Sequence, residues 1–272
     1  MRPIPIVFHL GPLPIHTYGI GLALTFVFGT WYLTKRFRDA GEPSEWLGNS
    51  AVWIIVGAIL GARVVQVISD LPFYLSSPSE IIAIWHGGLS SFGGLLFAVP
   101  LGLCLARRHC PEVPASLALD LAAPVLAAGW ALGRLLGPQL MIAGGGRATE
   151  AWYGMEYWGS VGRRVPVPIF QAIECFAVFL MVMALERWWP ERPAGILAAA
   201  AAAAWGAFRF GDQYFWLGTP GQLDAVEVGG LILFLVGIAS IVLLVIRAHR
   251  PRRSSVEAEH RIASIDLDRS LR

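Results

Sequence analysis

Three arginines lie inside apolar stretches that are long enough to cross a membrane, and their side chains could bind or activate a ligand there. Arg63 falls in AVWIIVGAILGARVVQVISD, Arg134 in LALDLAAPVLAAGWALGRLLG and Arg209 in GILAAAAAAAWGAFRFGDQ. A charge in hydrocarbon is costly, so each of them is a candidate functional residue that needs a partner. Three arginines at one depth predict a site for an anionic ligand, for which a lipid phosphate is the obvious candidate.

The composition is that of a membrane protein. Of the 272 residues, 56% are hydrophobic and 15% are charged. This balance is typical of a polytopic helical membrane protein, and the net charge of +2 gives no indication of nucleic-acid binding. Since a span needs about 20 mostly apolar residues, we predict an all-α fold with about seven transmembrane helices, at 17–34, 50–69, 89–106, 117–137, 167–185, 194–210 and 228–246.

The segments that connect these spans alternate in their content of basic residues. Arg or Lys follows the first, third, fifth and seventh spans, whereas 70–80 and 211–227 contain neither. The positive-inside rule therefore predicts an outside N-terminus and a cytoplasmic C-terminus. We expect one transmembrane domain, 1–246, with outer loops at 138–166 and 211–227. A polar cytoplasmic tail, 247–272, follows it and is expected to be disordered.

With this orientation, other polar residues fall at the same outer depth as the arginines. They stand at the outer ends of the first, third and fifth spans: His16, Tyr18, His86, Gln171 and Glu174. Asp120 is the exception, because it lies at the inner end of the fourth span, where the helix macrodipole favours an acid.

Each of these residues also has a purely structural interpretation. An arginine near a helix end often extends its charged head to the interface and does no chemistry. His86 can be an interfacial or capping residue, Tyr18 a member of the aromatic belt, and Glu174 the ion-pair partner of an arginine. The residues alone leave these alternatives open.

Two other classes of protein are disfavoured. A transporter is expected to hold its polar residues near the midplane of repeated halves, whereas here they gather in the outer half and no halves repeat. The outer polar set contains no His, Asp and Glu cluster at metal-ligand spacing. We therefore expect neither a metal nor a cofactor.

Six segments form a pattern when they are taken in chain order. They are FHLGPLPIHTYGIGLAL, ILGARVVQVI, IWHGGLSSFGGLL, LALDLAAPVLAAGWALGRLLG, WYGMEYWGSVGRRVPVPIFQ and WGAFRFGDQYF. In this order and at this spacing they resemble the prolipoprotein diacylglyceryl transferase family, over residues 9–245.

The resemblance implies a multi-pass enzyme of the bacterial inner membrane that transfers a diacylglyceryl group from phosphatidylglycerol to the lipobox cysteine of prolipoproteins. Bidentate arginines in a low-dielectric pocket suit the anionic donor and the leaving glycerol phosphate. The resemblance implies phosphate contacts from Arg134 and Arg209, with His86 as a further catalytic candidate. The implied substrate contacts come from His16, Tyr18, Arg63, Gln171 and Glu174.

The chain departs from the family pattern at several polar positions. The residues that replace the family's His, Asn, His, Glu and Glu are, in order, Phe92, Gly137, Val165, Gln171 and Gln213, and Asp212 stands beside the last. Two alternatives therefore stay open. One is a catalytically altered or inactive relative that binds an anionic phospholipid or a lipopeptide, and the other is a different lipid headgroup transferase.

Overall fold

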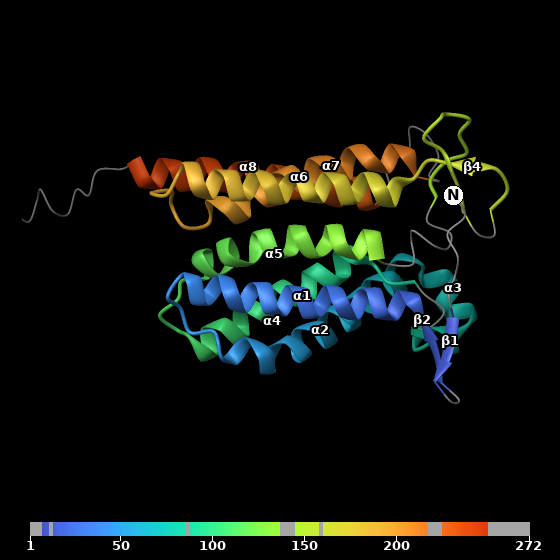
Figure 1. Ribbon diagram of the computed structural model, residues 1–272, viewed down its shortest axis with the longest axis horizontal. Helices are drawn as coiled ribbons and strands as arrows, with labels where there is room; N and C mark the ends of the chain where they lie inside the picture. The colour runs from blue at the N-terminus through green and yellow to red at the C-terminus, as the bar shows by residue number, and fades with distance from the viewer. Residues whose placement is uncertain are drawn as a thin grey trace, which may run out of the picture.

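The structure is a computed structural model that describes residues 7–10, 13–84, 88–136, 145–157, 160–216 and 225–249, with backbone only at 7–10, 13–18 and 91. Within these ranges the chain forms eight α-helices (Figure 1). They are α1 (Thr17–Asp39), α2 (Trp46–Ser69), α3 (Leu71–Ser76), α4 (Ser91–His109), α5 (Ala115–Leu136), α6 (Val167–Trp188), α7 (Ile196–Asp212) and α8 (Ala225–His249).

Short strands and 3-10 turns occupy one end of the helical bundle, which we call the strand end (Figure 1). β1 (Val7–Leu10) pairs antiparallel with β2 (Leu13–His16). β3 (Met155–Glu156) pairs antiparallel with β4 (Arg163–Arg164). The 3-10 turns are η1 (Pro78–Ile81) and η4 (Gln213–Phe215).

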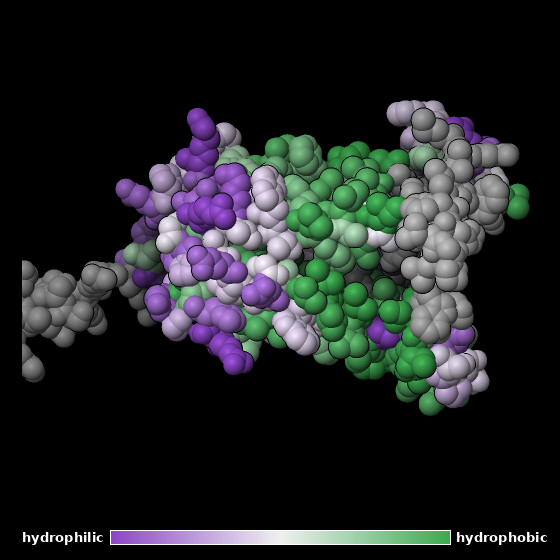
Figure 2. All heavy atoms as spheres, turned by 60° about the horizontal axis from the view of Figure 1, so that its bottom comes forward, coloured by the Kyte–Doolittle hydropathy of each residue, from purple (hydrophilic) through white to green (hydrophobic). Residues whose placement is uncertain are grey.

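The opposite end of the bundle is rich in basic residues, and we call it the basic end. Its Lys and Arg residues include Lys35, Arg36, Arg38, Arg107, Arg108, Arg187, Arg192 and Arg247. Figure 2 shows hydrophilic side chains gathered at this end and a hydrophobic band along the helices beside them. Such a band is what a hydrocarbon environment requires.

The prediction of an all-α membrane protein is confirmed. Each of the seven predicted spans corresponds to a helix of at least 17 residues, and α3 is a short additional helix of 6 residues. Four helices, α2, α5, α6 and α8, are long and apolar enough to cross a membrane by length and composition. The number of seven transmembrane helices stays a prediction.

The helices form two groups that meet at α5. α5 packs against α1 on one side and against α6 and α7 on the other, while α2 pairs with α4 and α7 with α8 (Figure 1). The α7–α8 pair is a backbone-to-backbone contact. A Cβ atom added at Gly206 would lie 2.5 Å from the Phe234 nitrogen, and one at Gly237 would lie 2.6 Å from the Ala203 nitrogen. Small residues permit this close approach in membranes.

A carboxylate from a neighbouring helix caps the N-terminus of α7. The N-cap residue, Gly195, has φ 104° and no side chain with which to cap the helix. Instead, Asp120 of α5 accepts hydrogen bonds from the Gly195 nitrogen (2.8 Å) and the Ala198 nitrogen (2.9 Å). The expectation that Asp120 serves the start of its own helix is corrected, because the N–H groups that need an acceptor belong to α7.

Replacement of Asp120 by alanine is expected to lower the free energy of unfolding by about 2 kcal/mol, because a buried charged acceptor of two N–H groups is lost. The measurement is thermal unfolding in detergent. Asp39→Ala is the matched control, since Asp39 makes only an exposed ion pair with Lys35. Equal unfolding temperatures for the two variants would contradict the capping role.

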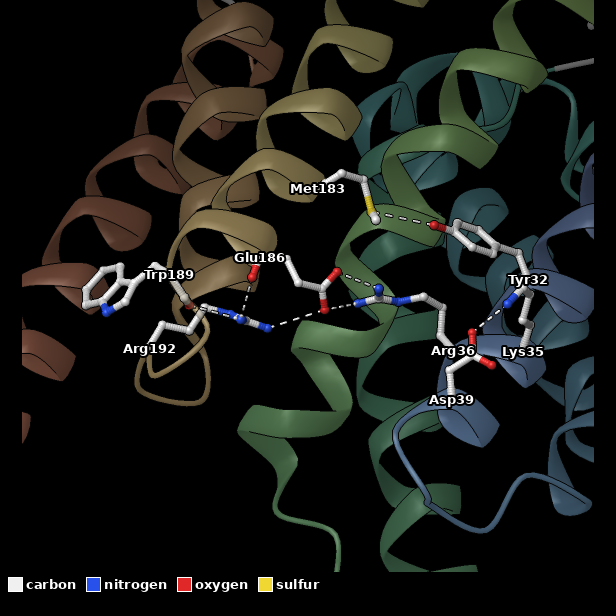
Figure 3. A network of polar contacts seen from close by, with 8 residues as sticks. All are labelled: Tyr32, Lys35, Arg36, Asp39, Met183, Glu186, Trp189 and Arg192. Atoms are coloured by element: carbon white, nitrogen blue, oxygen red, sulfur yellow. Dashed lines mark hydrogen bonds and ion pairs between the residues drawn. The ribbon is translucent and has the colours of Figure 1, made fainter.

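A network of ion pairs joins α1 to α6 at the basic end (Figure 3). Arg36 donates two hydrogen bonds to the Glu186 carboxylate, at 2.6 Å and 3.0 Å. Arg192, in the connection to α7, donates to the same carboxylate at 3.3 Å. The Glu186 carboxylate therefore pairs with two arginines from separate parts of the chain. Its loss would leave the two half-buried guanidinium groups close together without the negative charge between them.

For this reason, Glu186→Ala is expected to destabilise the bundle by about 1.5–3 kcal/mol, the range for hydrogen bonds to charged groups. Glu191→Ala, at an exposed position in the same connection, is the control and is expected to have an effect below about 0.5 kcal/mol. Thermal unfolding of both variants in the same detergent checks the difference, and an equal response would argue that the network contributes nothing.

Candidate active site

Polar side chains of α5, α6 and α7 meet inside the bundle near the strand end. α5 and α7 run toward this end and carry Arg134 and Arg209 in their last turns, while α6 starts there and carries Gln171 and Glu174 in its first turns. The three helices pack against one another. Their directions therefore bring residues that are far apart in the sequence to one level.

An ion pair with an added amide forms the centre of this cluster. Arg209 Nη1 donates to both oxygens of Asp212, at 3.0 Å and 2.8 Å. Gln171 Nε2 donates to Asp212 Oδ2 at 2.7 Å. All three side chains are buried, and Asp212 is only 3% exposed. The Asp212 carboxylate thus accepts three hydrogen bonds and neutralises the charge of Arg209.

Arg134 is buried beside this ion pair. It is 7% exposed, and its guanidinium lies over the ring of Trp130, 5.5 Å from the centroid. Both Arg209 and Asp212 are close enough for their charges to act on it. Among the residues that the structure describes, none forms a hydrogen bond or ion pair with Arg134. A buried charge without a partner is costly, so this guanidinium is suited to bind an anion.

Glu174 is the second acid of the cluster. It lies about one turn beyond Gln171 on α6 and is half-buried. The charges of Asp212 and Arg209 act on its carboxylate. Its carboxylate makes no hydrogen bond or ion pair within the described part of the chain. Unlike Asp212, whose oxygens are already occupied, Glu174 is therefore able to accept a proton or a hydrogen bond from a ligand.

Two tryptophans complete the arrangement, and the sequence reasoning above missed them. Trp130 and Trp205 pack edge to face with centroids 4.8 Å apart, and Phe92 lies 5.4 Å from Trp205. Each tryptophan stands four residues before an arginine, Trp130 before Arg134 and Trp205 before Arg209. Residues at this spacing share a helix face. The repeated Trp-x-x-x-Arg pattern was the signal that could have revealed them.

Arg63 lies in a different environment. It donates hydrogen bonds to the backbone carbonyls of Glu80, Ile81 (3.0 Å) and Gly88 (2.7 Å), among others, and its guanidinium lies over the ring of Tyr74. These bonds attach the segment that follows α3 to the end of α2. The described contacts of Arg63 are thus separate from the cluster around Arg209, and its predicted contact with substrate stays a prediction.

The remaining candidates are only partly described. His16 ends β2 and Tyr18 lies in the first turn of α1, both at the strand end, but their side chains lie outside the description. His86 lies outside the described residues altogether, as does Gly137. Phe92, where the resemblance implies a histidine, packs against Trp205 and has no group that could transfer a proton.

A segment containing β3 and β4 lies at the strand end and is hydrogen-bonded to the residues that follow α7. The Arg147 nitrogen donates to Phe215 O at 2.9 Å, and Arg147 Nε donates to Trp216 O at 2.9 Å. Tyr157 is buried in this segment, and burial raises its pKa to about 12. Its hydroxyl therefore stays protonated at neutral pH and cannot serve as a base.

A bundle of apolar helices that buries guanidinium and carboxylate groups near one end is a polytopic helical membrane protein with a candidate polar site. The chain belongs to the prolipoprotein diacylglyceryl transferase family, whose model matches residues 5–246.

Several relatives are named phosphatidylglycerol–prolipoprotein diacylglyceryl transferase. The one from Tolumonas auensis is 30% identical over 262 residues, which cover 92% of this chain and 97% of the relative. That from Geobacter sulfurreducens is 30% identical over 255 residues, with coverage of 88% and 95%. That from Azotobacter vinelandii is 33% identical over 214 residues, with coverage of 76% and 78%.

Proposed function

We propose that this protein transfers a diacylglyceryl group from phosphatidylglycerol to the cysteine thiol of a prolipoprotein signal sequence. The observation that carries the proposal is Arg134, a buried guanidinium without a hydrogen-bonding partner among the described residues, beside the Arg209–Asp212 pair. A phosphodiester supplies the missing anion. Because Asp212 already neutralises Arg209, we assign the primary contact with the phosphate to Arg134 and a secondary contact to Arg209.

The reaction replaces one bond by another at a methylene carbon of the donor. The thiolate sulfur attacks this carbon, the carbon–oxygen bond to the phosphate breaks, and glycerol phosphate leaves with the electron pair. Arg134 stabilises the charge that the leaving phosphate gains. The thiol proton must be removed, because the thiolate is the nucleophile, and Glu174 is the acid of the cluster whose carboxylate accepts no hydrogen bond from a described residue.

We further propose that the basic end faces the cytoplasm of a bacterial inner membrane, with the N-terminus outside. The distribution of arginine and lysine at the two ends supports this orientation. The cluster around Arg134 then lies in the outer half of the membrane, where an exported signal sequence brings its cysteine. Residues 247–249 continue α8, and the rest of the proposed cytoplasmic tail lies outside the described residues.

The test is a transfer assay with mass detection. Purified protein is mixed with phosphatidylglycerol and a synthetic lipobox peptide, and we expect the peptide to gain one diacylglyceryl group while glycerol phosphate is released. A peptide with serine in place of cysteine and a reaction with phosphatidylethanolamine are the controls.

Each departure from this result identifies a different alternative. Saturable binding of phosphatidylglycerol without transfer would identify a catalytically altered relative. Turnover of phosphatidylglycerol without the peptide would identify a headgroup transferase that uses another acceptor.

A further inference from the structure

The side chain of Trp130 carries a buried N–H group to which the reaction proposed above gives no function. Trp130 lies four residues before Arg134 on α5. Its indole Nε1 is buried, and none of the described residues accepts a hydrogen bond from it. A buried tryptophan N–H group usually has an acceptor, because a buried donor left unsatisfied destabilises the fold. We therefore expect a ligand to supply the acceptor.

The apolar side of Trp130 offers no such acceptor. The ring borders a cavity of about 750 Å³ between α4, α5, α7 and α8. The described side chains around this cavity are apolar except for Ser116, Ser240 and Arg247, all of which stand closer to the basic end than Trp130 does. Because an apolar cavity does not hold ordered water, the N–H group finds its acceptor on the other side of the ring.

The other neighbour of the Trp130 ring is the guanidinium of Arg134. The Cζ atom of Arg134 lies over the ring, 5.5 Å from its centroid, and Trp205 packs edge to face against the same ring at 4.8 Å. A cation over the face of a tryptophan is attracted by the ring. Unlike a carboxylate, the ring does not neutralise the charge. Trp130 can therefore hold Arg134 in place while its charge stays available to an anion.

Two donors without described acceptors thus lie side by side, the guanidinium of Arg134 and the N–H group of Trp130. They share one face of α5, because residues four apart on a helix are neighbours. A phosphate has two non-bridging oxygens, and each can accept a charge-assisted hydrogen bond at about 2.8 Å. One phosphate over this face can therefore accept hydrogen bonds from both groups. Arg209 differs, since Asp212 already accepts its hydrogen bonds.

We infer that Trp130 is a further phosphate-binding residue, whose ring positions Arg134 and whose N–H group donates a hydrogen bond to a non-bridging oxygen of the same phosphate. This inference rests on the proposed function, because it takes the anion at Arg134 to be the phosphate of phosphatidylglycerol. It accounts for both unsatisfied donors with one ligand. It also explains why an aromatic ring, and not a carboxylate, lies against this arginine.

Lipid binding by a variant that keeps an aromatic ring tests the N–H group. Trp130→Phe is expected to raise the Kd of the full-length protein for phosphatidylglycerol in detergent by about tenfold, the effect of losing one hydrogen bond to a charged group. Binding of diacylglycerol, which has no phosphate, is expected to stay unchanged. Trp188→Phe, at a position that is 80% exposed at the basic end, is the matched control. An unchanged Kd for phosphatidylglycerol in Trp130→Phe would overturn the inference.

Two further variants separate the ring from the N–H group. Trp130→Leu loses both, so its Kd for phosphatidylglycerol is expected to exceed that of Trp130→Phe by about threefold or more. In an Arg134→Ala background, Trp130→Phe is expected to leave the Kd unchanged, because the phosphate is no longer held beside the N–H group. Equal Kd values for the leucine and phenylalanine variants, or the same effect of Trp130→Phe in both backgrounds, would overturn the assignment.

The hydrogen bond can also be observed directly in the unmodified protein. With ¹⁵N-labelled tryptophan, the indole N–H resonance of Trp130 is assigned by its loss in Trp130→Phe. We expect phosphatidylglycerol to move this resonance downfield and diacylglycerol to leave it unchanged. A shift in a protein that shows no transfer would refute the proposed function and leave the phosphate site in place. Transfer by a protein whose resonance does not respond to phosphatidylglycerol would refute only the function of Trp130.

Discussion

Replacement of Arg134 by alanine is expected to lower kcat/KM for diacylglyceryl transfer by about 10²–10³-fold, the typical cost of removing one preorganised donor to a developing oxyanion. The same variant is expected to unfold at about the same temperature as the unmodified protein. Arg134 makes no hydrogen bond or ion pair with a described residue. Its removal therefore breaks no polar contact that the structure describes.

The combination of lost activity and retained stability separates a ligand-binding arginine from a structural one. Arg187→Ala, at an exposed position at the opposite end of the bundle, is the matched control and is expected to leave both quantities unchanged. Arg134→Lys keeps the charge but loses the bidentate geometry, so we expect activity between those of the alanine variant and the unmodified protein. A lowered unfolding temperature with full residual activity in Arg134→Ala would assign the residue to the fold instead.

The second large effect is expected at Asp212, and it is an effect on the stability of the fold. Asp212→Asn removes the charge that neutralises Arg209 at 2.8 Å, and breaking a buried ion pair on one side costs about 3–5 kcal/mol. We expect a marked fall in the unfolding temperature in neutral detergent. Because two arginines then lack an anion, added phosphatidylglycerol is expected to restore part of the loss, while zwitterionic phosphatidylethanolamine is not.

A double substitution tests how Gln171 and Asp212 together hold a negative charge beside Arg209. Gln171→Glu alone puts a second carboxylate where the amide now donates to Asp212 at 2.7 Å, and we expect it to destabilise the protein. Gln171→Glu combined with Asp212→Asn reverses the donor and the acceptor, and we expect it to recover most of the stability.

Asp70→Asn, at an exposed position near the same end, is the control for the Asp212 variants. Strict additivity of the two single effects would show that the Gln171 and Asp212 side chains are not coupled.

The helices and the depth of the arginines could be predicted from the sequence. Runs of about 20 apolar residues must be helical in a membrane, because every backbone polar group needs an internal partner there. The level of a side chain along each helix follows from its distance to the helix end, at about 1.5 Å per residue. Counted in this way, four of the polar residues fall near helix ends at one level: Arg134, Gln171, Glu174 and Arg209. What could not be predicted is which of them meet. Arg63 has the same depth and the same residue type, yet its guanidinium binds backbone carbonyls near η1.

Asp120 shows the same limit at the other end of the molecule. Its place in the first turns of α5 suggested a role in that helix, whereas its carboxylate caps α7, 75 residues further along the chain. The partner depends on how α5 and α7 pack, and a pattern within one helix carries no information about that.

The sequence by itself therefore determined that this protein is a helical bundle in a membrane and that it carries arginines near the ends of apolar helices, since length and hydropathy are properties of each segment. Only the tertiary structure decided that Asp212 neutralises Arg209, that Arg134 has no such partner among the described residues, and that the Trp130–Trp205 pair lies beside it. These features depend on distances of a few ångströms between helices, and such distances arise only when the helices pack.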